Sequence, residues 1–262
     1  QPFALGQAFG GEPANDHSGA PAISEDGNHV AFHSRAGNLL AEDANSSLDV
    51  FLYHRLTGQL EMVSTAWDGG AADGESAQAT LSADARYVAF ISTAGNLVAG
   101  DNNGLQDIFL RDMRQKSSTR LSVGSGGIES DGLSDRPAIS RDGRFVAFHS
   151  KGANLSANDR NGVYDVFLYD RDSAQLELIS QSTSGVRGNA ESVYPSISAD
   201  GRWVVFQSWA SNLEPGDLNF AADIFLRDRE QGTTRRVSLS NNRTAGDADN
   251  SNPGISADGR YV

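Results

Sequence analysis

The sequence predicts an all-β protein, specifically a β-propeller built from four-stranded antiparallel blades. A Ser-x-Asp-Gly-Arg anchor recurs every 58 residues, at Ser24, Ser82, Ser140, Ser198 and Ser256. A repeat of this length marks one supersecondary unit that must stack on copies of itself. Each unit holds four short runs rich in β-branched or aromatic residues and bounded by Gly, Asn, Asp or Ser, which is typical of strands and turns. No segment of helical length carries the apolar spacing of a helix.

The four runs follow one another in a fixed order, and in the second unit they cover residues 79–82, 87–92, 107–111 and 119–123. The second run is continuously apolar, as in Val88-Ala89-Phe90, which is typical of a strand whose sheet is covered on both faces. Four strands with both faces covered by neighbouring units describe a propeller blade. The Asp-Gly pair after the first run predicts a tight turn. Ala85 replaces this glycine in the second unit, so its turn is expected to be strained or differently shaped.

The two ends of the chain fall inside repeat units, and residues 1–262 are expected to form a single domain. Residues 1–8 align with the outermost strand of the other units and predict a stray outer strand. Residues 252–262 predict an incomplete last blade, with a first strand and the start of a second. Four complete units plus these parts favour a six-bladed ring in a longer native chain, with a five-bladed ring as the alternative. Open blade edges would also allow pairing with another copy of the chain.

Composition excludes several classes of function. The chain of 262 residues carries a formal net charge of −13 and no cysteine. A disulfide framework, a thiolate nucleophile and a Cys-based metal site are therefore excluded. Nucleic acid is not an expected partner, because phosphate binding needs a positive surface. No apolar run approaches the ~20 residues that span a membrane, so membrane insertion is not expected.

The string Ser-x-Asp-Gly-Arg-x-Val-Ala-Phe-x-Ser, followed by Asp-Ile-Phe-Leu-Arg-Asp, resembles the WD-like repeats of TolB-type β-propellers over essentially the whole chain. The resemblance implies a bacterial, exported protein that is periplasmic or extracellular. The usual proline after the anchor serine is absent, the loop between the second and third strands is longer, and the α/β domain that precedes the TolB propeller is not in this sequence. The resemblance therefore implies fold and compartment, but not the partners of TolB.

The long loop between the second and third strands contains Asp-x-Asn-x-x-x-Asp in all four complete units. Carboxylate and amide oxygens at this spacing can converge on Ca²⁺, a hard cation that takes 6–8 oxygen ligands. The candidate metal ligands are Asp43, Asn45, Asp49, Asp101, Asn103, Asp107, Asp159, Asn161, Asp165, Asp217, Asn219 and Asp223. The alternative is turn chemistry, in which Asn and Asp form Asx-turns and the last Asp caps the third strand. Further Asp and Asn residues precede the first strand and would line the same face, at Asn15, Asp73, Asp131, Asn189 and Asp247.

Other polar and aromatic positions are interpreted from the repeat alignment. The asparagines at Asn38, Asn96, Asn154 and Asn212 predict turns, because Asn tolerates the left-handed region. His33 and His149 share one position and are expected to be buried or to lie on a strand surface. Trp67 and Trp209 align with non-aromatic residues in most units and fall in loops. A singular exposed aromatic residue on a repeat scaffold can mark a partner site.

The function predicted from the sequence is a non-catalytic module that binds a protein partner or acts as a scaffold in the cell envelope or outside the cell. No Gly-x-Ser-x-Gly elbow and no His-Glu-x-x-His motif occurs, so no catalytic residue is predicted. An active site normally makes one blade unlike the others, whereas these units differ mainly at loop tips. Two alternatives stay open: a polysaccharide-active enzyme such as a lyase or glycosidase, and the non-catalytic propeller of a larger hydrolase.

Overall fold

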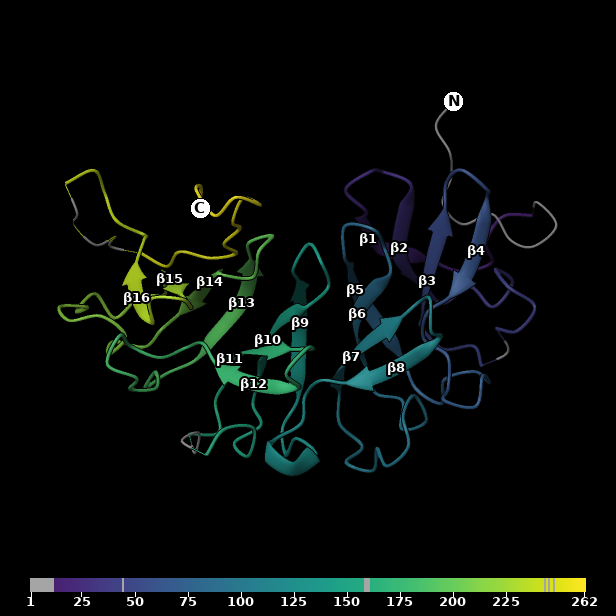
Figure 1. The fold of residues 1–262 in the computed structure, drawn as a ribbon, viewed down its shortest axis with the longest axis horizontal. Helices are drawn as coiled ribbons and strands as arrows, with labels where there is room; N and C mark the ends of the chain where they lie inside the picture. The colour runs from purple at the N-terminus through teal and green to yellow at the C-terminus, as the bar shows by residue number, and fades with distance from the viewer. Residues whose placement is uncertain (1–11, 44, 158–160, 243, 245, 247) are drawn as a thin grey trace. The chain divides into compact units, whose positions relative to one another are not determined.

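The computed structural model describes residues 12–43, 45–157, 161–242, 244, 246 and 248–262. Within these residues the chain forms four antiparallel sheets of four strands each, together with one short 3₁₀ helix at Ser125–Gly127 (Figure 1). Every sheet is a meander, because its strands pair in chain order. The predicted all-β class and the four-stranded unit are confirmed.

The four sheets are named blades 1 to 4 in chain order. Blade 1 consists of β1 (Ser18–Ile23), β2 (His29–Ser34), β3 (Asp49–His54) and β4 (Gln59–Met62). Blade 2 consists of β5 (Ser76–Leu81), β6 (Tyr87–Ser92), β7 (Asp107–Asp112) and β8 (Ser117–Arg120). Blade 3 consists of β9 (Ser134–Ile139), β10 (Phe145–Ser150), β11 (Asp165–Asp170) and β12 (Gln175–Leu178). Blade 4 consists of β13 (Ser192–Ile197), β14 (Trp203–Ser208), β15 (Asp223–Asp228) and β16 (Thr233–Arg236).

The chain divides into two compact units, Gln1–Leu121 with blades 1 and 2, and Ser122–Val262 with blades 3 and 4. In the first unit, Val50 and Leu52 of blade 1 share a buried core with Val88 and Phe90 of blade 2. The second unit repeats this arrangement, because residues of β10 and β11 pack with residues of β14 and β15. Within each unit, the continuously apolar second strand is therefore covered by a neighbouring blade, as the sequence predicts.

A pair of stacked phenylalanines forms the centre of each blade, one from its second strand and one from its third. The ring centroids lie 5.7–6.1 Å apart in the pairs Phe32–Phe51, Phe90–Phe109, Phe148–Phe167 and Phe206–Phe225. Seven of these eight rings are fully buried, and Phe32 is 3% exposed. Because the two rings are direct cross-strand partners, they fix the register between the second and third strands.

The anchor motif forms the same turn in every repeat. In blade 2 the Ser82 hydroxyl donates to Asp84 Oδ1 (2.7 Å), and its oxygen accepts the Tyr87 amide (3.0 Å). Ala85 adopts a left-handed φ of 54° and donates its amide to the Ser82 carbonyl, as Gly143 does to Ser140. The turn in blade 2 therefore has the usual shape, and the conformational strain of a non-glycine residue lies at Ala85.

The first strand of each blade contains a β-bulge that the sequence does not announce. A non-glycine residue has positive φ there, and these residues are Ala20, Gln78, Arg136, Tyr194 and, in the last repeat, Asn252. In three repeats the freed amide of the bulge donates to a side chain of the preceding blade, whereas the Arg136 amide donates to Asp135 of its own strand (2.7 Å). Gln78 donates to His33 (3.4 Å), Tyr194 to His149 (3.2 Å) and Asn252 to the Gln207 side-chain oxygen (3.4 Å). The shared histidine position is thus an acceptor between blades, and the expectation of a buried or strand-surface histidine is confirmed.

Stability is expected to decrease by about 2–3 kcal/mol through His149 as the pH falls from about 6.5 to about 4. Burial, reinforced by the charge of Arg136, lowers the His149 pKa to about 4. Tyr164 and Tyr194 also contact its ring. The neutral form is therefore favoured in the folded state, and its stabilising contribution is complete above the unfolded pKa of about 6.5. Urea denaturation at several pH values measures the effect.

His149→Gln is the matched variant for this prediction, because Gln207 already serves as the acceptor at the same position of blade 4. Its unfolding free energy should fall less steeply between pH 6.5 and 4 than that of the wild type. If the free energy of unfolding fell equally steeply with pH in the two proteins, His149 would have the same pKa in the folded and the unfolded state.

The two chain ends are described only in part. The stray strand predicted at residues 1–8 lies outside the described residues. In the last repeat, the anchor turn forms as elsewhere, with Ser256 donating to Asp258 (2.7 Å) and accepting the Tyr261 amide (3.0 Å). Residues 251–255 form no strand, and the amides of Asn252 and Ile255 instead donate to side chains of blade 4. Within the described part of the chain, we find no helical segment with the length and apolar character that a transmembrane helix requires.

Candidate functional site

The asparagines that follow the second strand connect two loops at the same end of each blade. In blade 2, Asn96 Oδ1 accepts the backbone amide of Asp73 (3.0 Å), and its Nδ2 donates to the Ala71 carbonyl (3.0 Å). Asn38, Asn154 and Asn212 form the same two bonds in the other blades. These residues therefore brace the loop before the first strand, in addition to shaping a turn. Asn15, Asp73, Asp131 and Asn189 all belong to this bracing, and Asp247 lies outside the described residues.

The aspartate that begins the third strand is buried and bonded to a serine beyond the fourth strand. Ser64 donates to Asp49 (2.7 Å), Ser180 to Asp165 (2.6 Å) and Ser238 to Asp223 (2.6 Å). Each serine oxygen also accepts the amide of the residue after the aspartate. Asp49, Asp107, Asp165 and Asp223 are fully buried. These aspartates stabilise the start of the third strand through hydrogen bonds. This agrees with the capping role that the sequence offers as the alternative to metal binding.

The candidate asparagine ligands form Asx-turns in all four blades. Their Oδ1 atoms accept the amide two residues later, at Ser47, Leu105, Val163 and Ala221. The Nδ2 atoms of Asn103, Asn161 and Asn219 donate to the strand aspartates Asp107, Asp165 and Asp223 (2.8–3.1 Å). In blade 1, Asn45 Nδ2 donates to the Ala72 carbonyl (2.9 Å), as Asn219 Nδ2 also does to the Gly246 carbonyl (3.1 Å). These asparagines are predicted from the sequence either to bind a metal or to form turns, and the hydrogen bonds of the turns are present in the structure.

The first aspartate of the motif has different partners in different blades. In blade 2, Asp101 pairs with Arg120 (2.7 Å), whose Nη1 also lies 3.8 Å from Asp107. In blade 4, Arg236 Nη1 lies 2.9 Å from both Asp217 and Asp223. The sequence prediction missed these arginines because they occupy the last position of the fourth strand in only two of the four units. Their equivalents are Met62 in blade 1 and Leu178 in blade 3.

Blade 1 therefore holds a buried carboxylate pair without an arginine. Asp43 is 5% exposed, and within the described residues neither of its carboxylate oxygens has a hydrogen-bond partner. Burial, followed by repulsion from Asp49, raises the Asp43 pKa to about 6. Burial also raises the pKa of Asp49 and of Asp217, where the charge of Arg236 acts in the opposite direction.

The described residues contain no group of three His, Cys, Asp or Glu side chains that could hold a metal ion. A cation in these loops would therefore take two carboxylates from the protein and complete its shell with carbonyl oxygens and water. Asp159 of blade 3 lies outside the described residues, so the pair of this blade is described only at Asp165.

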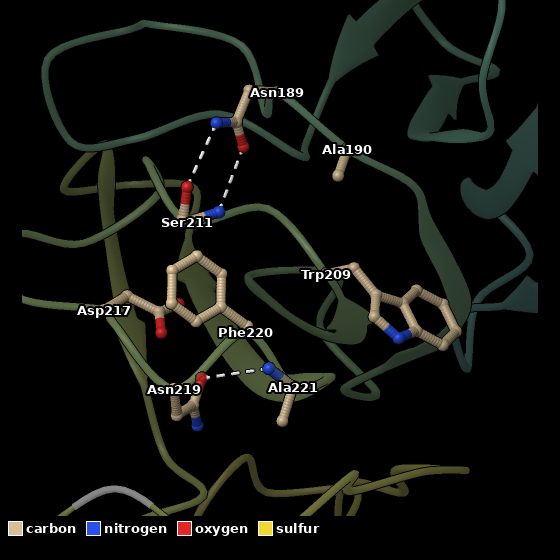
Figure 2. A pocket seen from close by; sticks show the side chains of 8 residues that line it. All are labelled: Asn189, Ala190, Trp209, Ser211, Asp217, Asn219, Phe220 and Ala221. Atoms are coloured by element: carbon tan, nitrogen blue, oxygen red, sulfur yellow. Dashed lines mark hydrogen bonds between the residues drawn. The ribbon is translucent and has the colours of Figure 1, made fainter.

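A second feature is a shallow pocket of about 210 Å³ at the loop end of blade 4 (Figure 2). Its lining comes from two loops: the one before β13 and the long one that connects β14 to β15. The lining residues are Asn189, Ala190, Trp209, Ser211, Asp217, Asn219, Phe220 and Ala221. The side chain of Asn189 forms two hydrogen bonds with Ser211 (3.0 and 3.1 Å), and Asn219 accepts the Ala221 amide (3.2 Å) (Figure 2).

The loop before β15 exposes two large apolar side chains, one of which lines this pocket. Phe220 is 94% exposed and Leu218 is 77% exposed. Phe220 also has a left-handed φ of 55°, at the position where blades 2 and 3 have Gly104 and Gly162. We call Leu218, Phe220 and Trp209 the apolar loop patch.

The two loop tryptophans singled out by the sequence are both exposed. Trp209 is 39% exposed and lines the pocket, whereas Trp67 is 69% exposed and lies in a loop of the first unit. The sequence shows Phe220 at the glycine position of an otherwise regular repeat, but this residue was not predicted to be a binding residue.

Several solved structures are similar to this chain, although no protein-family model and no curated protein sequence matches it. TolB of Agrobacterium tumefaciens is 16% identical, with a TM-score of 0.52 over 87% of this chain and 64% of that protein. An oligogalacturonate lyase of Vibrio parahaemolyticus is 14% identical, with a TM-score of 0.52 over 85% of this chain and 53% of the lyase.

The propeller domain of the Trilobed protease of Pyrococcus furiosus is also similar, with 12% identity and a TM-score of 0.50 over 85% of this chain and 57% of that domain. The fold is a β-propeller. At these identities the likeness concerns fold alone, and the chain spans less than two thirds of each of these proteins. The fold is shared by TolB and by enzymes, so it does not by itself assign a reaction or a partner.

Proposed function

We propose that this β-propeller is a non-catalytic binding module, located in the periplasm or outside the cell, that holds a protein partner on the apolar loop patch. The observation that supports this most strongly is the exposed and strained Phe220. A bulky residue with positive φ costs roughly 1 kcal/mol or more, and glycine at this position in two other blades avoids the cost. The exposed ring also gives up the stabilisation that burial would provide.

The polar groups around the patch favour a protein partner over a sugar. Carbohydrate recognition needs hydrogen-bonding groups that can be directed at ligand hydroxyls. Here the side chains of Asn189 and Ser211 bond to each other, and Asn219 bonds to its own loop and to Asp223. The groups beside the patch are thus already committed, and what the loop offers is mainly apolar surface. Exposed aromatic and leucine side chains of this kind serve as anchors in protein interfaces.

The net charge of −13 also favours some protein partners over others. An acidic protein attracts basic surfaces and repels acidic ones, which affects mainly the rate of association. We therefore expect a partner that inserts apolar side chains at the patch and carries basic residues around them. Pairing with a second copy of the chain through open blade edges is the other mode of association considered, and a concentration-dependent mass in solution would reveal it.

Replacing Leu218 and Phe220 together by serine is expected to weaken partner binding at least tenfold without lowering the melting temperature, because both side chains are exposed. The partner is first captured from an envelope extract by cross-linking, and its purified form is then titrated against both proteins by calorimetry. Leu56→Ser is the matched control, because Leu56 is 74% exposed in a different blade. It should leave the affinity unchanged.

Two results would contradict the proposal. Equal affinity of wild type and double variant would show that the patch is not the interface. Retention on a polysaccharide column that is lost in Trp209→Ala would favour the polysaccharide-active alternative.

A further inference from the structure

The buried carboxylate pair of blade 1 has a hydrogen bond from Ser64 to Asp49 but no arginine at the position that supplies one in blades 2 and 4. Asp43 is 5% exposed and Asp49 is fully buried. Both Asp43 oxygens and Asp49 Oδ2 lack a hydrogen-bond partner within the described residues. Buried polar atoms are nearly always bonded, and a buried charge is very costly unless it is paired or coordinates a metal. We therefore expect a positive group between the carboxylates of Asp43 and Asp49.

Blades 2 and 4 show which group the repeat supplies. Arg120 and Arg236 each come from the last position of the fourth strand, where they face a phenylalanine of the third strand. Each guanidinium contacts both aspartates of its own loop. The equivalent residue of blade 1 is Met62, which faces Phe51 in the same register. Blade 1 therefore keeps the two carboxylates of the site but has no cationic side chain at this position.

We propose that blade 1 binds a divalent cation, Ca²⁺, between Asp43 and Asp49, at the place that the guanidinium group occupies in blades 2 and 4. The available ligands are carboxylate and backbone carbonyl oxygens, which suit Ca²⁺ and not the softer metals that prefer nitrogen or sulfur. A charge of +2 matches two carboxylates. Only two acidic side chains contribute, so the affinity expected is that of a weak extracellular site, with a Kd of about 10⁻⁴–10⁻³ M.

This proposal narrows the calcium prediction made from the sequence and stands independently of the partner site in blade 4. The motif is present in all four units, but the arginine fills its cation position in two of them. Asn45 is not required as a ligand, because its oxygen already accepts the Ser47 amide. Its role here is to hold the loop that presents Asp43 and Asp49.

The test compares melting temperatures and calorimetric titrations with CaCl2 for the full chain and three variants. Addition of 5 mM CaCl2 should raise the melting temperature of the wild type by about 3–6 °C relative to EDTA. Met62→Arg should melt higher than the wild type in EDTA and should not respond to CaCl2. Asp43→Asn should also lose the response. Asp68→Asn removes an exposed carboxylate of the same unit and should keep it.

If Met62→Arg does not fold, the calcium titration of the wild type and of Asp43→Asn tests the proposal without it. No heat of binding and no melting shift in the wild type would overturn the proposal. A full response retained in either Asp43→Asn or Met62→Arg would overturn it as well, since calcium would then act elsewhere.

Discussion

Replacing Phe109 by alanine is expected to lower the free energy of unfolding by about 3–5 kcal/mol. Phe109 is fully buried in β7, stacks on Phe90 with ring centroids 5.9 Å apart, and belongs to the core shared by blades 1 and 2. Removing the ring loses its transfer free energy and leaves a cavity that strands on both sides hold open. Urea denaturation followed by tryptophan fluorescence measures the change.

The control for Phe109→Ala is Phe220→Ala, which deletes the same ring from an exposed loop. Its free energy of unfolding should stay within about 0.5 kcal/mol of the wild type. If Phe109→Ala cost less than 1 kcal/mol, the stacked pair would not be the centre of the blade. Because neighbouring repeats can unfold in steps, two probes should be compared before a single free energy is assigned.

The strands that carry these rings were the part of the fold most accessible from the sequence. The predicted runs at residues 87–92 and 107–111 coincide with β6 (Tyr87–Ser92) and nearly so with β7 (Asp107–Asp112). Their signal is strong because both strands are buried along their whole length and their central residues are apolar. The outer run predicted at residues 119–123 ends earlier, at Arg120 in β8. A strand that is buried on one side only has a weaker apolar pattern in its sequence. Its ends depend on its hydrogen bonds with the neighbouring strand.

The bulge in the first strand could not be predicted, because neither the residue types at its position nor the contacts that it makes in other blades are visible in the local sequence. Gln78 and Tyr194 are not residues that favour positive φ. Their amides are drawn to His33 and His149, which precede them by 45 positions. The repeat alignment grouped the two histidines correctly but could not identify what they bind.

The candidate metal site shows the same limit more sharply. The alignment placed identical Asp and Asn residues in four loops and predicted identical chemistry for all of them. The loops differ through one residue outside the motif, at the end of the fourth strand. Where that residue is Arg120 or Arg236, a cation is built into the blade, and where it is Met62 the carboxylates are left without one. The blades thus differ in a tertiary contact between the end of the fourth strand and the aspartate loop. The sequence alone does not show that these two positions are close.

Replacing Arg236 by methionine is expected to cost about 3–5 kcal/mol of stability in the presence of EDTA. The Arg236 side chain is 9% exposed, and its Nη1 lies 2.9 Å from both Asp217 and Asp223, which are themselves almost completely buried. Removing one member of a buried ion pair leaves uncompensated charge, and here it leaves two carboxylates facing each other. The variant converts the blade 4 site to the residue set of blade 1, so millimolar CaCl2 should recover part of the loss.

Arg235→Met is the control for this substitution, because Arg235 precedes Arg236 in β16 but is exposed. It removes the same charge from the chain and should change the free energy of unfolding by less than about 0.5 kcal/mol. Denaturation in urea, with EDTA or with CaCl2, separates the two contributions. If Arg236→Met and Arg235→Met cost the same, the guanidinium of Arg236 does not stabilise the loop, and the equivalence between arginine and cation fails. A large loss in EDTA that calcium partly recovers would establish that the repeat satisfies one buried carboxylate pair in two ways.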